Sequence, residues 1–159
     1  MNKLNKNRTH KWDPSGSFYL FITQRFISRP LVPFLIKLGI KNPNAVSIFS
    51  FILILISSAL LLFLDQNSVI NRIIAALLIE LSLIFDCTDG QIATHLNKET
   101  LFGGWFDTYV DRIGEMVLYT VIGYITWMFY GSFIYFILGV FTGYLFTYYS
   151  IMSSQKDSL

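Results

Sequence analysis

The sequence predicts an all-α polytopic membrane protein, a bundle of about four transmembrane helices preceded by an amphipathic helix at the membrane surface. Hydrophobic residues make up 53% of the 159-residue chain and charged residues only 14%, a composition typical of small polytopic membrane proteins. Apolar stretches long enough to cross a bilayer follow one another after residue 42, separated by short polar turns.

Residues 1–41 are expected to form a cytosolic tail and a juxtamembrane amphipathic helix. Residues 1–12 are basic, carry no acidic side chain and lack the apolar core of a secretory signal. Residues 18–27 mix apolar and polar side chains, a pattern too short and too polar to span a membrane. They fit a helix lying on anionic headgroups, and equally a helix packed on its own protein. Pro30 and Pro33 are expected to break this pattern before it resumes.

The expected spans form a transmembrane domain at residues 42–152. Asn44 is a good N-cap for a first span at residues 46–64, which is long enough to cross roughly 30 Å. The second span begins near residue 69 and ends in a stretch rich in carboxylates, and the third begins in that stretch and ends near residue 130. After a Gly-Ser turn, the fourth runs to about residue 152, and residues 153–159 form a second cytosolic tail.

Basic side chains predict the orientation. With an even number of spans both termini face one side, and that side would hold eleven of the 12 Lys and Arg residues: Lys3, Lys6, Arg8, Lys11, Arg25, Arg29, Lys37, Lys41, Lys98, Arg112 and Lys156. Only Arg72 would lie opposite. The bias predicts an integral, multi-pass protein with both termini and the carboxylate-rich stretch on the cytosolic side.

The carboxylate-rich stretch, residues 86–111, places four Asp and three Gly where lipid would favour apolar side chains. Each unpaired carboxylate near the centre of a membrane helix costs roughly 2.5 to 3.5 kcal/mol on the insertion scale, so these groups require a compensating partner. Helical spacing groups them into two faces. The first face holds Asp86, Asp89 and Ala93, and the second holds Gly103, Asp107, Asp111 and Glu115.

Two such faces can meet and hold cations between them. Gly90 and Gly103 lack side chains, which predicts a close approach of the two helices at this point. Converging carboxylates repel one another unless cations bind between them, and hard cations such as Mg²⁺ or Mn²⁺ suit a set of oxygen ligands. Two ions of this kind could orient a diphosphate and stabilise charge on the attacking and leaving oxygens.

The same stretch resembles the signature of the CDP-alcohol phosphatidyltransferases, Asp-x-x-Asp-Gly-x-x-Ala-Arg-(x8)-Gly-x-x-x-Asp-x-x-x-Asp. Seven of the eight specified residue types are present at the same spacing: Asp86, Asp89, Gly90, Ala93, Gly103, Asp107 and Asp111. The one departure is Thr94, which stands where the family has Arg. The resemblance extends more loosely over residues 25–149.

The resemblance implies a membrane phosphotransferase of phospholipid biosynthesis. Such enzymes move a substituted phosphate from a CDP-activated donor, such as CDP-diacylglycerol, to a polar alcohol and release CMP; inositol phosphate and glycerol phosphate are both candidate acceptors. The implied ligands of the two metal ions are Asp86, Asp89, Asp107 and Asp111, and Asp111 is also the implied general base. The implied contacts to the CDP moiety are Gly90, Ala93 and Gly103. Family members usually have six spans, and this chain has room for about four.

Other functions remain open. Thr94 removes the positive charge that the family has at this position, unless Arg112 or Lys98 replaces it. This loss and the short chain also fit a non-catalytic relative that binds metal and CDP-lipid as a partner. Intramembrane carboxylates also fit a divalent-cation transporter subunit, although these cluster at one end of the spans. Glu115 could line the cavity, but it is expected to be a structural carboxylate, either protonated or paired with Arg. Membrane lipids are expected partners, and nucleic acid is not.

Gly139 and Gly143 in the fourth span have the spacing of a close helix contact. That contact could lie within the bundle or between two copies of the chain, so a homodimer is one expectation.

Overall fold

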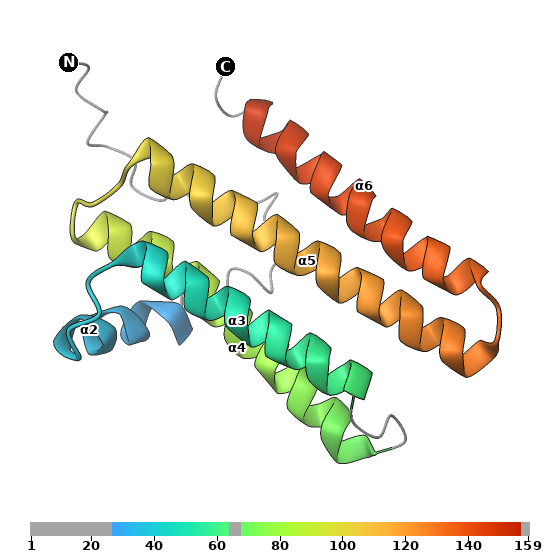
Figure 1. Cartoon of the computed structure of the whole chain (residues 1–159). Helices are drawn as coiled ribbons and strands as arrows, with labels where there is room; N and C mark the ends of the chain where they lie inside the picture. Colours follow the sequence, from blue (N-terminus) through green and yellow to red (C-terminus); the bar gives the residue numbers. More distant parts are fainter. Residues whose placement is uncertain (1–26, 64–67, 157–159) are drawn as a thin grey trace.

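The structure, a computed structural model, describes residues 27–63 and 68–156. Across these residues the regular elements are helices (Figure 1). They are α2 (Arg29–Lys37), α3 (Pro43–Phe63), α4 (Val69–His95), α5 (Leu101–Tyr130) and α6 (Ile134–Lys156). The predicted all-α membrane bundle is confirmed, and α3 to α6 begin close to the positions expected for the four spans.

Two of these helices are long and apolar enough to cross a membrane by length and composition. They are α3 with 21 residues and α5 with 30 residues, and α6 contains a shorter apolar stretch at Ile134–Tyr149. Helix α4 has 27 residues but carries Arg72, Glu80 and two Asp side chains along its length. The number of membrane passes therefore stays a prediction.

Helix α2 corrects the expected effect of the two prolines. The predicted surface helix at residues 18–27 falls almost entirely outside the described residues, but α2 continues through both Pro30 and Pro33. Pro30 is tolerated because backbone N–H groups in the first turn need no helical partner. Pro33 lies deeper and removes one donor. Burial of α2 against the core at Val46 and Ile92 offsets that loss.

Helix α3 is the organising element of the bundle. It packs against both α4 and α5, whereas the backbones of α4 and α5 do not approach each other closely. Helix α6 packs on α5, and the short α2 packs on α4. Figure 1 shows α3 alongside α4, and α5 alongside α6. The four long helices therefore follow the contact order α4, α3, α5, α6.

Serine side chains join α3 to α4. The hydroxyl of Ser50 donates to the carbonyl of Ser82 at 3.0 Å, and the hydroxyl of Ser82 donates back to the carbonyl of Ser50 at 2.9 Å. Further along, the Ser57 hydroxyl donates to the carbonyl of Ala75 at 2.9 Å. Small side chains let two backbones approach, and interhelical hydrogen bonds in membranes are worth about 0.6 kcal/mol each on average. We refer to these contacts as the serine seam.

Glycines join α5 to α6. A Cβ added at Gly139 would lie 2.6 Å from the Cα of Gly123 and 2.7 Å from the carbonyl oxygen of Tyr119. Gly143 packs less tightly, with an added Cβ 3.4 Å from the Cα of Met116. The interpretation of Gly139 and Gly143 as a contact within the bundle is confirmed. A homodimer stays a prediction, and it would need a surface other than this one.

We expect Gly139→Ala to lower the free energy of unfolding by about 1 to 3 kcal/mol, because the new methyl group would meet backbone atoms that cannot turn aside. Gly104→Ala is the matched control, since Gly104 is also helical and has nothing within 4 Å of an added Cβ. That control should be neutral or more stable by up to about 1 kcal/mol. Thermal unfolding in lipid nanodiscs measures both, and equal transition temperatures would contradict the packing assignment.

Candidate functional site

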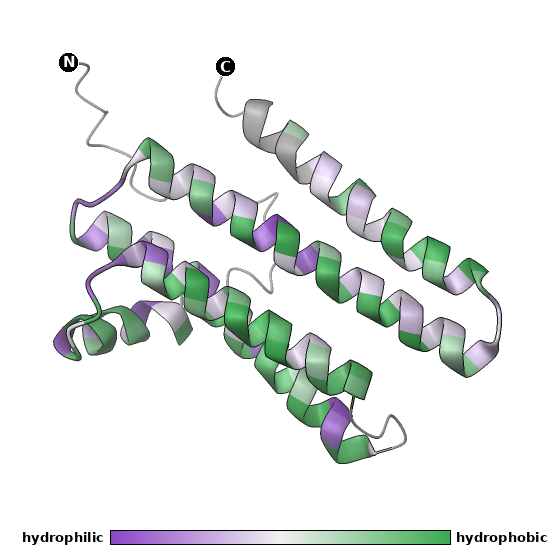
Figure 2. Ribbon diagram, viewed as in Figure 1, coloured by the Kyte–Doolittle hydropathy of each residue, from purple (hydrophilic) through white to green (hydrophobic). Residues whose placement is uncertain are grey.

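Hydrophilic residues gather at the end of the bundle where α3 begins and α4 ends (Figure 2). A short turn there joins the two halves of the carboxylate-rich stretch. Helix α4 ends as Asn97 adopts a positive φ of 53°, a conformation that Asn tolerates better than most residues. Helix α5 begins after Thr100, whose hydroxyl accepts a hydrogen bond from the Gly103 amide at 2.9 Å. The turn brings the last part of α4 and the first part of α5 to the same end.

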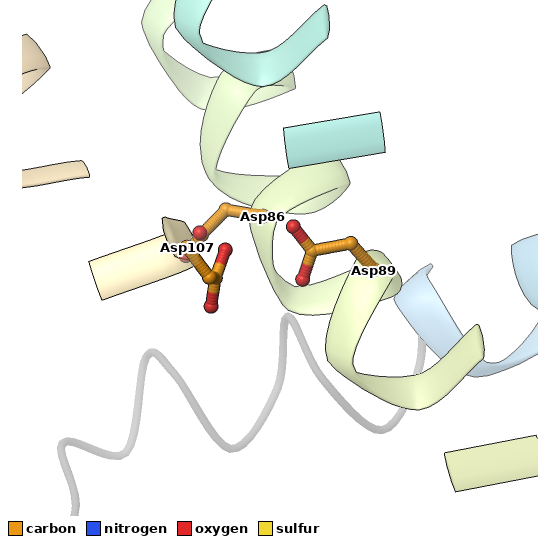
Figure 3. A group of neighbouring side chains, drawn as sticks. All are labelled: Asp86, Asp89 and Asp107. Carbon is orange, nitrogen blue, oxygen red and sulfur yellow. The ribbon is translucent and has the colours of Figure 1, made fainter. Parts of the chain in front are cut away.

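Three carboxylates converge at this point. Asp86 and Asp89 from α4 and Asp107 from α5 each offer an oxygen, and these oxygens all lie within 4.8 Å of one another. Figure 3 shows the three side chains pointing toward a common space. One oxygen of Asp107, Oδ1, is buried and has no hydrogen-bond partner. An all-oxygen set that includes an orphaned buried oxygen fits a hard divalent cation.

Asp111 lies beside this group. Its side chain is in hydrogen-bond contact with Asp86, as Asp89 is with Asp107. Carboxyl groups in such contact need either a shared proton or a cation between them, because two full negative charges repel at this distance. The structure therefore brings all four predicted carboxylates into one connected cluster.

Glu115, one helical turn beyond Asp111, has a different partner. It forms an ion pair with Arg112, whose guanidinium lies 5.7 Å from the centre of the Phe146 ring on α6. The predicted pairing of Glu115 with Arg is confirmed, and its role as a structural carboxylate stays a prediction. Lys98 is also engaged, since its Nζ donates to the carbonyl of Lys41 at 2.9 Å. Both basic side chains considered as substitutes for the family's Arg therefore have contacts of their own.

The predicted close approach at Gly90 and Gly103 is wrong. Gly90 is exposed, with no atom within 4 Å of an added Cβ. A Cβ on Gly103 would meet Thr100 at 2.9 Å and Asn44 of α3 at 3.5 Å, not α4. The physical reason is that α3 packs on both helices and holds their backbones apart. Asn44 is not the predicted cap either, because α3 begins at Pro43, a residue suited to a first helical turn.

Thr94 and Ala93 lie at the exposed end of α4. The Thr94 hydroxyl is 3.0 Å from the carbonyl oxygen of Gly90 and 2.6 Å from Oε1 of Glu99. The Ala93 carbonyl accepts a hydrogen bond from the amide of Lys98 at 2.8 Å and so takes part in closing the helix. The position where the family has Arg thus carries a neutral side chain beside an acidic one.

The sequence reasoning missed Ser47 of α3. This side chain is 2% exposed and donates a hydrogen bond to Oδ2 of Asp89. Its only signal in the sequence is a serine in an apolar span. Helical spacing does not reveal which neighbouring helix such a serine faces.

Residues 40–158 match the family model of the CDP-alcohol phosphatidyltransferases. The chain belongs to the CDP-alcohol phosphatidyltransferase family. The match covers the helices from α3 onward and includes every residue of the signature, so the resemblance drawn from the motif is confirmed. Members of this family are integral membrane proteins that bind a CDP-alcohol donor and an alcohol acceptor and use divalent metal ions.

Two relatives show how much of the chain is similar to known proteins. An uncharacterized protein of Aquifex aeolicus is 33% identical over 125 residues, which cover 79% of this chain and 56% of the relative. The archaetidylinositol phosphate synthase of Pyrococcus horikoshii is 30% identical over 81 residues, 51% of this chain and 39% of the relative. The chain therefore aligns with between about two fifths and three fifths of the length of these relatives.

For this family member we expect Mg²⁺ or Mn²⁺ to raise the thermal unfolding temperature, because a cation relieves the repulsion among the clustered carboxylates. At a free metal concentration of one hundred times Kd the stabilisation would be about 2.7 kcal/mol. Asp107→Asn should raise the transition temperature without metal, since it removes one of the repelling charges, and should reduce the shift caused by metal. Glu99→Gln is the control outside the cluster, and an equal loss of the shift in that variant would count against the assignment.

Proposed function

We propose that this protein catalyses the metal-dependent transfer of a substituted phosphate from a CDP-activated donor to the hydroxyl of a polar alcohol, releasing CMP, in phospholipid biosynthesis. The observation that carries the proposal is the convergence of Asp86, Asp89 and Asp107 within 4.8 Å from the two halves of the family signature. The diphosphate of a CDP-linked donor is an anion, so the carboxylate cluster would bind it through cations held between the two.

In this proposal Asp86, Asp89, Asp107 and Asp111 hold the metal, most simply as two ions of Mg²⁺ or Mn²⁺. When bound, these ions would neutralise the charge of the diphosphate and align it for displacement. The protein's share of the work is to keep four carboxylates from two helices in one small space. That arrangement needs charge neutralisation and alignment more than covalent chemistry, as phosphoryl transfer generally does.

Asp111 is the proposed general base. A carboxylate oxygen of Asp111 takes the proton of the acceptor hydroxyl while the hydroxyl oxygen forms a bond to the phosphorus that carries the lipid or alcohol group. The bond from that phosphorus to the bridging oxygen of the diphosphate breaks, and CMP leaves with the electron pair. The contact of Asp111 with Asp86 supports this role, because it places the base next to the carboxylates that hold the donor.

The nucleotide is proposed to lie against the small residues of the signature. Gly90 presents exposed backbone with open space around it, which suits close approach of a cytidine or its phosphates. Ala93 lies one turn further along α4, and Gly103 lies at the start of α5. In this proposal the CDP moiety lies against these three residues, between the two halves of the signature.

The acceptor is proposed to be a phosphorylated alcohol. The Pyrococcus relative is named for archaetidylinositol phosphate, which supports an inositol phosphate, and glycerol phosphate is the other candidate. Exposed basic side chains at Arg29, Lys37 and Lys41 lie on the α2 side of the site end and could attract such an anion. With the topology predicted from the charges, the site and both termini would face the cytosol.

Asp111→Asn should reduce CMP release by about 100-fold or more, because the substitution removes the proton acceptor. The assay uses the purified chain in lipid nanodiscs with Mg²⁺ or Mn²⁺, CDP-diacylglycerol and a panel of alcohols that includes inositol phosphate and glycerol phosphate. Glu99→Gln, a matched change of carboxylate to amide, should retain most of the activity. Metal-dependent CMP release that persists in Asp111→Asn would overturn the assigned role, and the alcohol that supports release identifies the acceptor.

A second candidate, binding of metal and CDP-lipid without turnover, is favoured by Thr94. That side chain is exposed, uncharged and bonded to Glu99, so no positive charge stands there to support the departing CMP. The third candidate, a divalent-cation transporter subunit, draws no support from the carboxylate cluster, because the cluster lies at one end of the bundle. Metal flux into liposomes that contain the protein would support the transporter.

Thr94→Arg should raise the rate of CMP release by about tenfold or more, because it supplies a fixed positive charge near the leaving group. Glu99 would partly neutralise that charge, so the double variant Thr94→Arg with Glu99→Gln should be faster still. Glu99→Gln alone is the control. Unchanged rates in both Arg variants would show that the missing charge does not limit turnover, and CDP-lipid binding without CMP release in every variant would support the partner role.

A further inference from the structure

We propose that Ser47 is a positioning residue of the carboxylate site, a donor from α3 that fixes the orientation of Asp89 between the two halves of the signature. The inference rests on the metal site of the proposed function, but it is tested by metal binding and does not require turnover.

The contact between Ser47 and Asp89 is buried on both sides. Each of the two residues is 2% exposed, and the Ser47 hydroxyl donates to Oδ2 of Asp89. That hydroxyl has one proton and one other acceptor within reach, the carbonyl oxygen of Pro43 at 3.4 Å. A hydrogen bond to a charged acceptor is the stronger of the two, so the Ser47 hydroxyl donates its hydrogen bond to the carboxylate. One oxygen of Asp89 is thereby held by α3.

The rest of the Asp89 carboxyl group is left for the site. Its other side-chain contact is with Asp107, which comes from α5. Asp89 therefore stands between a neutral donor on α3 and a carboxylate on α5. A ligand held on one side by a hydrogen bond presents its remaining oxygen in a defined direction, as outer partners of metal ligands generally ensure.

The placement of Ser47 on α3 gives this contact its importance. Asn44, three residues earlier and so on the same side of the helix, lies near Gly103 at the start of α5. The first two turns of α3 thus lie beside both halves of the signature, near α5 at Asn44 and bonded to α4 at Ser47. Because the backbones of α4 and α5 do not come into contact, the packing of each helix on α3 helps to set their separation at the site.

Ser47 differs from the other serines that join α3 to α4. In the serine seam the acceptors of Ser50 and Ser57 are backbone carbonyls or a hydroxyl, all neutral groups. Such bonds hold two helices together but orient no ligand. Ser47 instead meets an acidic side chain of the signature. The chain therefore contains its own control for the purely structural effect of a buried serine.

The experiment measures Mn²⁺ binding to the full chain in nanodiscs of uncharged lipid, from the electron paramagnetic resonance signal of free Mn²⁺, with no donor or acceptor present. Ser47→Ala should raise the Kd for Mn²⁺ by about tenfold to 100-fold, the usual effect of losing an outer partner of a metal ligand. Ser47→Thr, which keeps the hydroxyl, should restore binding to within a few-fold of the parent. Ser50→Ala should leave Kd unchanged, although it lowers the unfolding temperature.

Three results would overturn the proposal: parental Mn²⁺ affinity in Ser47→Ala, an equal loss of affinity in Ser50→Ala, or no saturable Mn²⁺ binding in the parent. The unfolding temperature of each variant shows whether it is folded. If Ser47→Ala is unfolded, Ser47→Thr still decides, since full loss of affinity in a folded Thr variant would contradict a role for the hydroxyl. A parent that binds Mn²⁺ with the expected pattern but releases no CMP would sustain the positioning role and remove the transferase.

Discussion

The two helices that carry the halves of the carboxylate site meet through their acidic side chains but not through their backbones, so the geometry of the site depends on α3, which packs on both. Asp86 and Asp89 are held through the serine seam and Ser47 on one side of α3. Asp107 is held through the glycines of α5 on the other, where Gly114 accommodates side chains of α3. Because α3 packs on both helices, it sets the distance between their backbones and so helps to hold the carboxylates together.

Electrostatics at the site then follow from a shortage of positive charge. Arg112 is paired with Glu115, and Lys98 is bonded to the carbonyl of Lys41. The buried donor that meets the cluster, Ser47, is neutral and satisfies one oxygen. Carboxylates with so few positive partners in the protein destabilise the fold in a low-dielectric environment. A bound cation removes this destabilisation, and the free energy gained contributes to cation affinity. Metal binding and the stability of the bundle are therefore expected to be coupled.

The remaining contacts divide the bundle into two kinds of interface. Hydrogen-bonded serines join α3 to α4, whereas bare glycine backbones join α5 to α6. Both allow close approach of helices that apolar lipid would not drive together. The two outer helices, α4 and α6, expose large apolar side chains such as Leu77 and Phe141, as a surface facing lipid would.

Local chemistry in the sequence determined the helices and the composition of the site. Turn residues and apolar length set where α3 to α6 begin, and the signature spacing placed four carboxylates and the neutral Thr94 on known faces, because caps and helical periodicity act over a few residues. Tertiary structure decided which faces meet. Helical spacing indicates which side of its helix Gly90, Gly139 or Ser47 occupies. It does not indicate that Gly90 is open to solvent, that Gly139 contacts Gly123, or that Ser47 bonds to Asp89. The outcomes at Gly90 and Ser47 depend on α3 standing between α4 and α5, and the outcome at Gly139 depends on α6 packing on α5. These contacts between helices are not encoded in the periodicity of the sequence.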